Sequence, residues 1–189
     1  MLERTGLFID GGYLVSALRR EFGLMEEFPI NPLKMCADLI KRVDAGRLQR
    51  AYYYDCPPYQ HETPRKGDDE RATRKKKLFD FINDLPNFEV RLGELKLVVL
   101  RDGKEEYVQK GVDLLMGIDL VRMASKGAMS DAIILTGDAD FVPAVEAAKA
   151  EGVNVTCVTG KMAAKSLITI CDHHILMTKA ILKLWLPSE

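Results

Sequence analysis

Short apolar segments with strand character alternate with segments of helical periodicity along this chain of 189 residues. The segments that read as strands are 6–10, 48–55, 88–95, 131–137, 153–160 and 173–177. The segments that read as helices are 13–23, 31–43, 69–85, 112–125, 141–152 and 165–171. Strands that alternate with helices indicate βαβ units, since parallel strands are joined by crossover connections. The order predicts an α/β fold with a mostly parallel central sheet.

Two segments stand outside this alternation. Residues 96–110 read KLVVLRDGKEEYVQK, in which Asp102-Gly103 separates two extended runs, a pattern typical of a hairpin. We therefore expect a β-hairpin insertion near 95–109, whose apolar residues could serve a homodimer. Residues 178–189 are expected to form a C-terminal tail that packs against the rest of the domain.

The composition indicates one ordinary globular domain spanning residues 1–189, with no internal repeat and no linker. The net charge of -1 excludes a globally basic nucleic-acid binder but leaves room for a local basic patch. The four cysteines are scattered, so neither a zinc ribbon nor a disulfide framework is indicated. No apolar run is long enough to span a membrane, and a cytoplasmic location is the expectation.

Acidic residues follow two of the expected strands. Asp10 ends the first strand, and Asp138 and Asp140 follow the strand over 131–137. A parallel sheet binds ligands at the carboxyl ends of its strands, where the strand order reverses. If these two strands are neighbours, their aspartates converge there, and Asp113 in the first turn of the helix over 112–125 is a fourth candidate. Like charges this close raise one another's pKa unless a cation lies between them.

Each of these aspartates also has a purely structural interpretation. Asp140 could be the N-cap of the helix that follows it, and Asp113 could complement a helix dipole. Asp10, which precedes two glycines, could be a turn residue. One shared cation explains all of them together, and carboxylates without nearby histidine or cysteine favour Mg²⁺ or Mn²⁺ over zinc. Such ions can activate a water for displacement at a phosphodiester.

Three motifs carry a resemblance to a known family. FIDGGYL, QKGVDLLMGIDL and ILTGDADFVPAVEAAKAEGVNV occur in this order, and together they resemble the NYN domain family in its LabA-like branch, within the PIN-like ribonucleases. The resemblance covers nearly the whole chain. It implies a single-domain three-layer sandwich around a parallel sheet and a Mg²⁺- or Mn²⁺-dependent acidic site that cuts RNA.

The resemblance also assigns residues. Asp10, Asp113, Asp138 and Asp140 match its acidic positions as catalytic and metal-binding residues. Asp119 is a second-tier candidate, because helical geometry turns it away from Asp113, and a pairing with Arg122 is its structural alternative. Many relatives carry an asparagine where this chain has Tyr13, so the polar role of that position is open here.

Basic residues suggest where single-stranded RNA would bind. The densest basic stretch, residues 61–77, follows the second strand and so begins at the edge of the sheet where the aspartates are expected. Phosphate contacts from such a flank position a strand without reading its sequence. The candidates are Arg65, Lys66, Arg71, Arg74, Lys75, Lys110 and Lys161, with Tyr13 and Tyr59 as possible stacking residues. A solvated helix face is the alternative interpretation.

Three classes of function remain open at this stage. The first is a metal-dependent ribonuclease that hydrolyses single-stranded RNA. The second is a catalytically silent RNA-binding or regulatory module on the same fold. The third, which fits less well, is a nucleotide-sugar transferase that uses the Asp-x-Asp sequence of residues 138–140. The segment CDHH at 171–174 contains potential metal ligands, but these lie too close in sequence to reach one ion together.

Overall fold

The structure is a computed structural model that describes residues 3–24, 29–59, 61, 65–100 and 104–187. Its strands are β1 Arg4–Asp10, β2 Arg47–Asp55, β3 Phe88–Leu92, β4 Glu94–Val99, β5 Glu105–Lys110, β6 Asp131–Leu135, β7 Asn154–Thr159 and β8 His173–Leu176. Its helices are α1 Gly11–Phe22, α2 Pro32–Arg42, α3 Asp68–Asn83, α4 Val112–Ser125, α5 Val142–Ala150, α6 Lys165–Ile170 and α7 Lys179–Trp185, with a short 3-10 helix η1 at Ala139–Phe141.

The main sheet has the order β3-β2-β1-β6-β7-β8, and its strands are parallel. β1 lies in the middle, with β2 on one side and β6 on the other. The first part of the chain therefore builds the sheet outward in one direction, and the part after α4 builds it in the other. The expected neighbourhood of the first strand and the strand over 131–137 is confirmed, because Ile9 pairs with Leu135.

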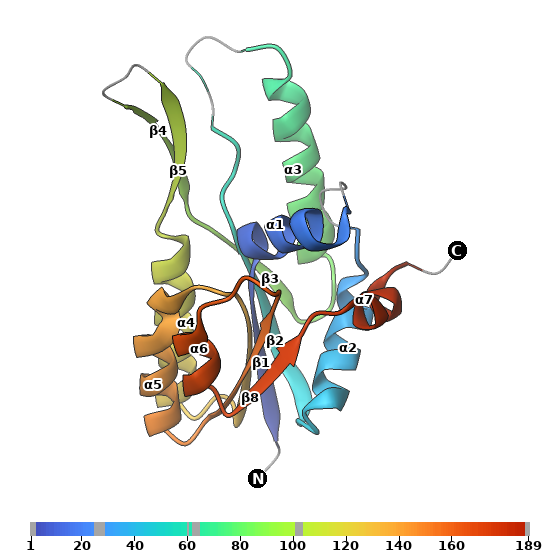
Figure 1. The fold of residues 1–189 in the computed structure, drawn as a ribbon, viewed down its shortest axis with the longest axis vertical. Coiled ribbons are helices and arrows are strands. Elements are labelled where there is room, and N and C mark those ends of the chain that lie inside the picture. Colours follow the sequence, from blue (N-terminus) through green and yellow to red (C-terminus); the bar gives the residue numbers. More distant parts are fainter. Residues whose placement is uncertain (1–2, 25–28, 60, 62–64, 101–103, 188–189) are drawn as a thin grey trace.

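Helices cover both faces of this sheet, which makes the fold the expected three-layer α/β sandwich. Alternate residues of β1 serve the two faces, since successive strand side chains point to opposite sides. Leu7 and Ile9 pack in one buried cluster with residues of α1, α2, α3 and α7. Phe8 packs in the other with residues of α4, α5 and α6. Figure 1 shows α4, α5 and α6 on the left of the sheet and α2 and α7 on the right.

Local signals set several helix ends as the sequence predicts. Gly23 adopts the left-handed conformation (φ 69°) after α1, and its backbone N–H donates to the Arg19 carbonyl. The Asn31 side chain accepts hydrogen bonds from the backbone N–H groups of Leu33 and Lys34, and it therefore caps α2. Such caps satisfy backbone groups that have no partner within the helix.

The segment 88–95 differs from the expected single strand, because the chain leaves the sheet at Gly93. The Gly93 N–H donates to the Asp55 carbonyl at 2.9 Å. A Cβ at this position would lie 2.7 Å from the Lys110 carbonyl oxygen, so the crossing of the two segments requires glycine. After Gly93, β4 pairs antiparallel with β5 and confirms the predicted hairpin. The expected Asp102-Gly103 turn lies outside the described residues.

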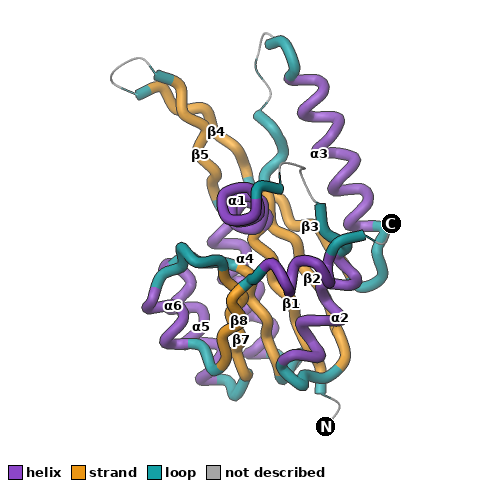
Figure 2. Tube along the Cα trace, turned by 45° about the vertical axis from the view of Figure 1, so that its right-hand side comes forward, coloured by secondary structure: helices purple, strands orange, loops and turns teal. Residues whose placement is uncertain are grey.

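The hairpin projects from the body of the domain beside α3. Figure 2 shows β4 and β5 extending past the end of the main sheet, with the first turns of α3 extending in the same direction. Val99 of the hairpin is 65% exposed. A dimer built on these apolar residues stays a prediction.

The C-terminal segment forms α7, which packs on α2. The Trp185 indole is fully buried, and its N–H donates to the Asp38 carboxylate at 2.8 Å. The Asn31 N–H donates to the Trp185 carbonyl, so backbone and side chain both fix the helix. In the described part of the chain, no helix has the length and apolar character needed to cross a membrane.

Replacing Trp185 with alanine tests how far α7 stabilises the domain. We expect Trp185→Ala to lower the free energy of unfolding by about 3–5 kcal/mol, because it leaves a cavity and removes the bond to Asp38. Leu184→Ala is the matched control, since Leu184 belongs to the same helix but is 55% exposed. Urea unfolding followed by circular dichroism measures both. Equal losses in the two variants would contradict a structural role for the buried indole.

Candidate functional site

Three aspartates line one cleft at the carboxyl edge of the sheet. Asp10 comes from the end of β1, Asp138 from the loop after β6, and Asp113 from the first turn of α4. The cleft has a volume of about 630 Å³, and α1 contributes Gly12, Tyr13, Ser16 and Arg20 to its wall. Three distant segments thus meet where the sheet reverses its strand order, the place where open parallel sheets bind ligands.

Asp140 does not line this cleft. It lines an adjoining groove of about 720 Å³ between α4 and α5, whose walls include the exposed side chains of Leu114 and Ile118. Asp113 borders both hollows. The structure therefore brings Asp10, Asp113 and Asp138 together, and it links Asp140 to them through Asp113.

The carboxyl groups influence one another electrostatically. Partial burial raises the pKa of Asp113, and the nearby charges of Asp138 and Asp140 raise it further. Burial likewise raises the pKa of Asp10, to about 6, with smaller contributions in the same direction from Asp113 and Asp55. Negative charge at this edge is thus unfavourable without a counter-charge.

Asp10 is held in place by two hydrogen bonds. One carboxylate oxygen accepts the Tyr13 backbone N–H at 2.9 Å and caps α1. The other accepts the Thr136 hydroxyl at 3.3 Å, which connects the ends of β1 and β6. Both bonds favour the ionised carboxylate and lower its pKa, but burial outweighs them. Asp10 is therefore both a helix cap and a member of the cleft.

The sequence-based alternative made Asp140 the helix cap after β6, and the structure assigns this role to a different aspartate. The residue that caps is Asp138, not Asp140, because an Asp138 carboxylate oxygen accepts the Asp140 backbone N–H at 3.0 Å at the start of η1. Asp140 is exposed within η1. Asp113 does lie in the first turn of α4, as the helix-dipole interpretation requires. The cap at Asp138 occupies one oxygen and is compatible with a ligand on the other.

The donor set fits a hard divalent cation bound in an open site. In the residues that the structure describes, no three His, Cys, Asp or Glu side chains lie close enough together to enclose a metal ion. The candidates for holding one are carboxylates only, the ligand type that Mg²⁺ and Mn²⁺ prefer. Mg²⁺ commonly keeps several waters and takes only one or two protein carboxylates. An open cleft bordered by Asp10, Asp113 and Asp138 satisfies that requirement.

Asp119 is separate from this cleft. It is buried, and its carboxylate accepts the Tyr54 hydroxyl at 3.1 Å and lies 3.7 Å from the Arg91 guanidinium. The sequence allows an ion pair between Asp119 and Arg122, but in the structure the cation next to Asp119 is Arg91. These contacts connect α4 to β2 and β3, so the structure gives Asp119 a packing role.

Two residues at the site went unrecognised in the sequence. Asp55 ends β2, next to β1; it is buried, accepts the Cys56 N–H at 2.7 Å and forms an ion pair with Lys75. Arg20 lines the cleft from α1, on the face it shares with Tyr13 and Ser16. Two features of the sequence could have identified them. Asp55 is an aspartate at the end of a predicted strand, as Asp10 is, and Arg20 lies at helical spacing from residues 13 and 16.

Tyr13 fastens α1 to the loops after β6 and β7. Its hydroxyl accepts the Gly160 backbone N–H at 2.8 Å. A Cβ at position 137 would lie 2.5 Å from the Tyr13 ring. The loop that carries Asp138 can therefore pack this closely against Tyr13 only because residue 137 is glycine. The Tyr13 side chain therefore shapes the cleft wall.

The predicted RNA-binding cations fall into two groups. Arg65, Arg71 and Lys75 form ion pairs with Glu105, Asp68 and Asp55 respectively. Lys66, Arg74, Lys110 and Lys161 are exposed. The start of α3 and the hairpin both extend beyond the carboxyl edge (Figure 1), but none of these predicted cations lines the cleft. Its contact with RNA stays a prediction.

The CDHH segment has structural contacts. Asp172 accepts the Val155 N–H at 2.8 Å and pairs with Lys149 at 2.8 Å. The His174 ring is 2.8 Å from the Thr159 hydroxyl. These contacts join β7, β8 and α5 and give no support to a metal site in this segment.

The raised pKa of Asp10 predicts a pH-dependent effect on stability. Ionising Asp10 requires more free energy in the folded than in the unfolded chain. Its charge therefore lowers the free energy of unfolding increasingly as pH rises from about 4 through about 6, and the full loss is reached above that range. Asp10→Asn keeps a good N-cap residue and removes this penalty. In EDTA, the variant should match the parent near pH 4 and exceed its free energy of unfolding by up to about 3 kcal/mol at pH 8.

Urea unfolding at several pH values measures this difference. Asp80→Asn is the control, since Asp80 is exposed on α3 and distant in sequence from every cleft residue. A difference between Asp10→Asn and the parent that stays constant from pH 4 to pH 8 would contradict the raised pKa.

Comparisons with known proteins agree with this architecture. A crystal structure of a protein of unknown function from Vibrio parahaemolyticus is similar to the chain, with a TM-score of 0.66 and 17% identity over 98% of this chain and 96% of that one. This likeness concerns the fold. Comparison with curated proteins gives no match. The model of the NYN domain matches residues 4–178, from the start of β1 to the cap of α7. The chain belongs to the NYN domain family, whose fold is that of the PIN-like nucleases.

Proposed function

We propose that this protein is a Mg²⁺- or Mn²⁺-dependent ribonuclease that hydrolyses phosphodiester bonds of single-stranded RNA. The observation that carries the proposal is the cleft in which Asp10, Asp113 and Asp138 meet at the strand-order reversal. Membership of a nuclease family supports the same chemistry. The LabA-like branch, a cytoplasmic location and possible homodimerisation belong to this proposal as well.

In this proposal one or two of the carboxylates bind the cation directly, the others contact it through its bound waters, and the cleft positions the phosphate. The cation would supply activation of the attacking water and stabilisation of the leaving oxygen. Asp10 and Asp113 must be ionised to serve as ligands, so binding should weaken as pH falls through about 6, the pKa of Asp10. Tyr13, Gly137 and Thr136 fix the loops that carry the carboxylates.

Two other functions remain as alternatives. A catalytically silent RNA-binding or regulatory module would use the same fold without hydrolysis. A nucleotide-sugar transferase is less suited, because Asp138 and Asp140 face different hollows instead of one common site. A nuclease assay separates these possibilities.

Removing one ligand should abolish cleavage and metal stabilisation together. The parent should degrade labelled single-stranded RNA in Mn²⁺, and its melting temperature should rise as Mn²⁺ passes its dissociation constant. Asp138→Asn should lose at least about 100-fold in cleavage rate, a loss of the size seen when one preorganised catalytic group is removed. Asparagine still caps η1, so this variant should remain as stable as the parent in EDTA.

Asp131→Asn controls for the loss of one negative charge from the same part of the chain. Asp131 begins β6 at the opposite end from the cleft, so this variant should retain both cleavage and the Mn²⁺ effect. Melting curves that respond equally to Mn²⁺ in the parent and in Asp138→Asn would remove Asp138 from the metal site. Metal binding by a parent that never cleaves RNA would favour the silent module.

Arg20 is expected to bind the phosphate backbone of the substrate. Among the described residues that line the cleft, Arg20 is the one cation; its side chain is 49% exposed and lies 3.6 Å from the Glu21 carboxylate. Arg20→Ala should weaken RNA binding by about 10-fold and lower the salt dependence of binding by about one phosphate contact. Arg19→Ala is a matched control, because Arg19 is the preceding exposed residue of α1 and does not line the cleft. Salt titrations by fluorescence anisotropy compare them, and equal slopes would exclude this role.

A further inference from the structure

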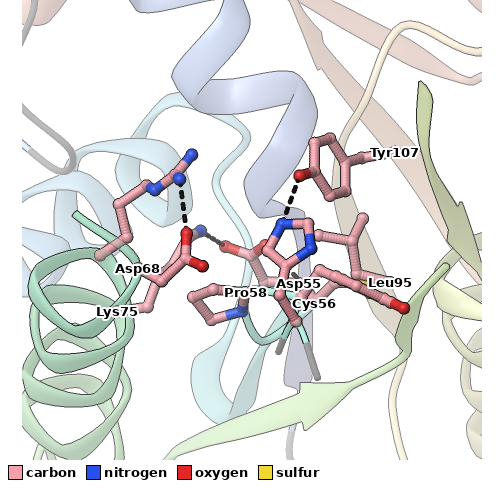
Figure 3. Close-up of a pocket in the computed structure, with 10 residues that line it drawn as sticks. Asp55, Cys56, Pro58, Asp68, Lys75, Leu95 and Tyr107 are labelled. Atoms are coloured by element: carbon pink, nitrogen blue, oxygen red, sulfur yellow. Dashed lines mark hydrogen bonds and ion pairs between the residues drawn. The ribbon is translucent and has the colours of Figure 1, made fainter. Parts of the chain in front are cut away.

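A second, smaller pocket opens on the same edge of the sheet. It lies between α3, the segment that follows β2, and the hairpin, and has a volume of about 270 Å³. Figure 3 shows Pro58, Leu95 and Tyr107 around it, with the Asp55–Lys75 pair between α3 and the segment after β2. This volume is just under the roughly 300 Å³ at which pockets for small-molecule ligands begin, so it suits one small planar ring system.

Aromatic rings from two distant segments line this pocket. The rings of Tyr59 and His61 have centroids 5.0 Å apart, and the ring of Tyr107 on β5 lies 5.9 Å from the first and 6.0 Å from the second. The His61 ring is also 2.8 Å from the Tyr107 hydroxyl. Tyr107 is 41% exposed, so this cluster is accessible to a ligand and is not part of the core. Aromatic faces at such a site are suited to stacking on a planar group.

The charges in the pocket favour an uncharged ligand over a phosphate. Each pocket cation has a carboxylate partner that also lines the pocket, Lys75 with Asp55 and Arg71 with Asp68. These pairs offer hydrogen-bond donors and acceptors but little net positive charge. A nucleobase presents both kinds of group along its edge.

The pocket adjoins the carboxylate cleft. Asp55, which lines the pocket, follows Tyr54, and Tyr54 pairs with Asp10 across the β1–β2 ladder. Adjacent strands lie about 5 Å apart. Burial is the main cause of the raised pKa of Asp10 and of the Cys56 thiol in the pocket, and the charges of Asp55 and Asp113, respectively, add to these two shifts. The cleft and the pocket thus open beside neighbouring strands at the same edge of the sheet.

We infer that this pocket receives one unpaired base of an RNA strand whose neighbouring phosphate lies in the carboxylate cleft. The inference rests on the proposed function and extends it to the way in which the substrate is held. A base in a duplex is stacked and paired and cannot enter a pocket of this kind, so the site selects single strands. Tyr59, His61 and Tyr107 provide stacking, and the ion pairs at the pocket provide polar contacts.

The test measures binding without cleavage. The probe is a fluorescein-labelled oligouridylate decanucleotide in Ca²⁺ buffer, with its integrity checked on a gel and its affinity measured by anisotropy. Tyr107→Ala should weaken binding by about 5- to 150-fold, the range for loss of one base–aromatic stack. Tyr107→Phe keeps the ring and should bind like the parent. Phe81→Ala is the matched control, because Phe81 is a 50% exposed aromatic residue on α3 that does not line the pocket.

A second series replaces each base of the probe in turn with an abasic nucleotide. For the parent, one abasic position should lower the affinity more than any other. For Tyr107→Ala, the same abasic position should cause no further loss, because the ring on which that base would stack has already been removed. Binding by Tyr107→Ala that equals that of Phe81→Ala, or an abasic series with no sensitive position, overturns the pocket assignment alone. Absence of any binding by the parent overturns both the pocket and the RNA substrate. Position-dependent binding without cleavage under Mn²⁺ overturns the nuclease proposal and leaves the pocket standing.

Discussion

The pairing of β1 with β6 is the contact on which the site depends. More than half of the chain separates these strands, and their parallel alignment places Asp10 and the loop carrying Asp138 at one edge. Burial of both faces of β1 stabilises this arrangement, with Leu7 and Ile9 in one cluster and Phe8 in the other. Because the chain extends from β1 in one direction and from β6 in the other, a crevice opens between their carboxyl ends.

Gathering carboxylates at this edge is unfavourable, and the fold offsets part of the cost through its helix ends. Asp10 caps α1, Asp138 caps η1, and Asp113 lies in the first turn of α4. Positive helix N-termini favour negative side chains, so each aspartate has a local partner. The raised pKa values of Asp10 and Asp113 indicate that these partners compensate incompletely. The structural and the metal-binding interpretations of these residues are therefore compatible.

Several cations of the basic stretch after β2 are used in ion pairs within the domain. Lys75 reaches the buried Asp55, and Arg65 reaches Glu105 on the hairpin. These cations fasten α3 and the hairpin around a pocket, and part of their charge is neutralised there. In the cleft itself, Arg20 from α1 lines the wall beside the carboxylates.

The local elements, the α/β class and the acidic residues that close β1 and follow β6 could all be predicted from the sequence. Periodicity, the Asn31 cap and the Gly23 stop act within a few residues, so they can be recognised without the fold. Contacts between distant segments set the strand break at Gly93, the pairing of Asp119 with Arg91, and the position of Asp55 at the strand end next to Asp10. They also place Asp140 at the groove between α4 and α5 and bring Tyr59 beside Tyr107. These outcomes depend on which side chains meet across long sequence separations, and that meeting is set by packing of the whole sheet and not by any local pattern.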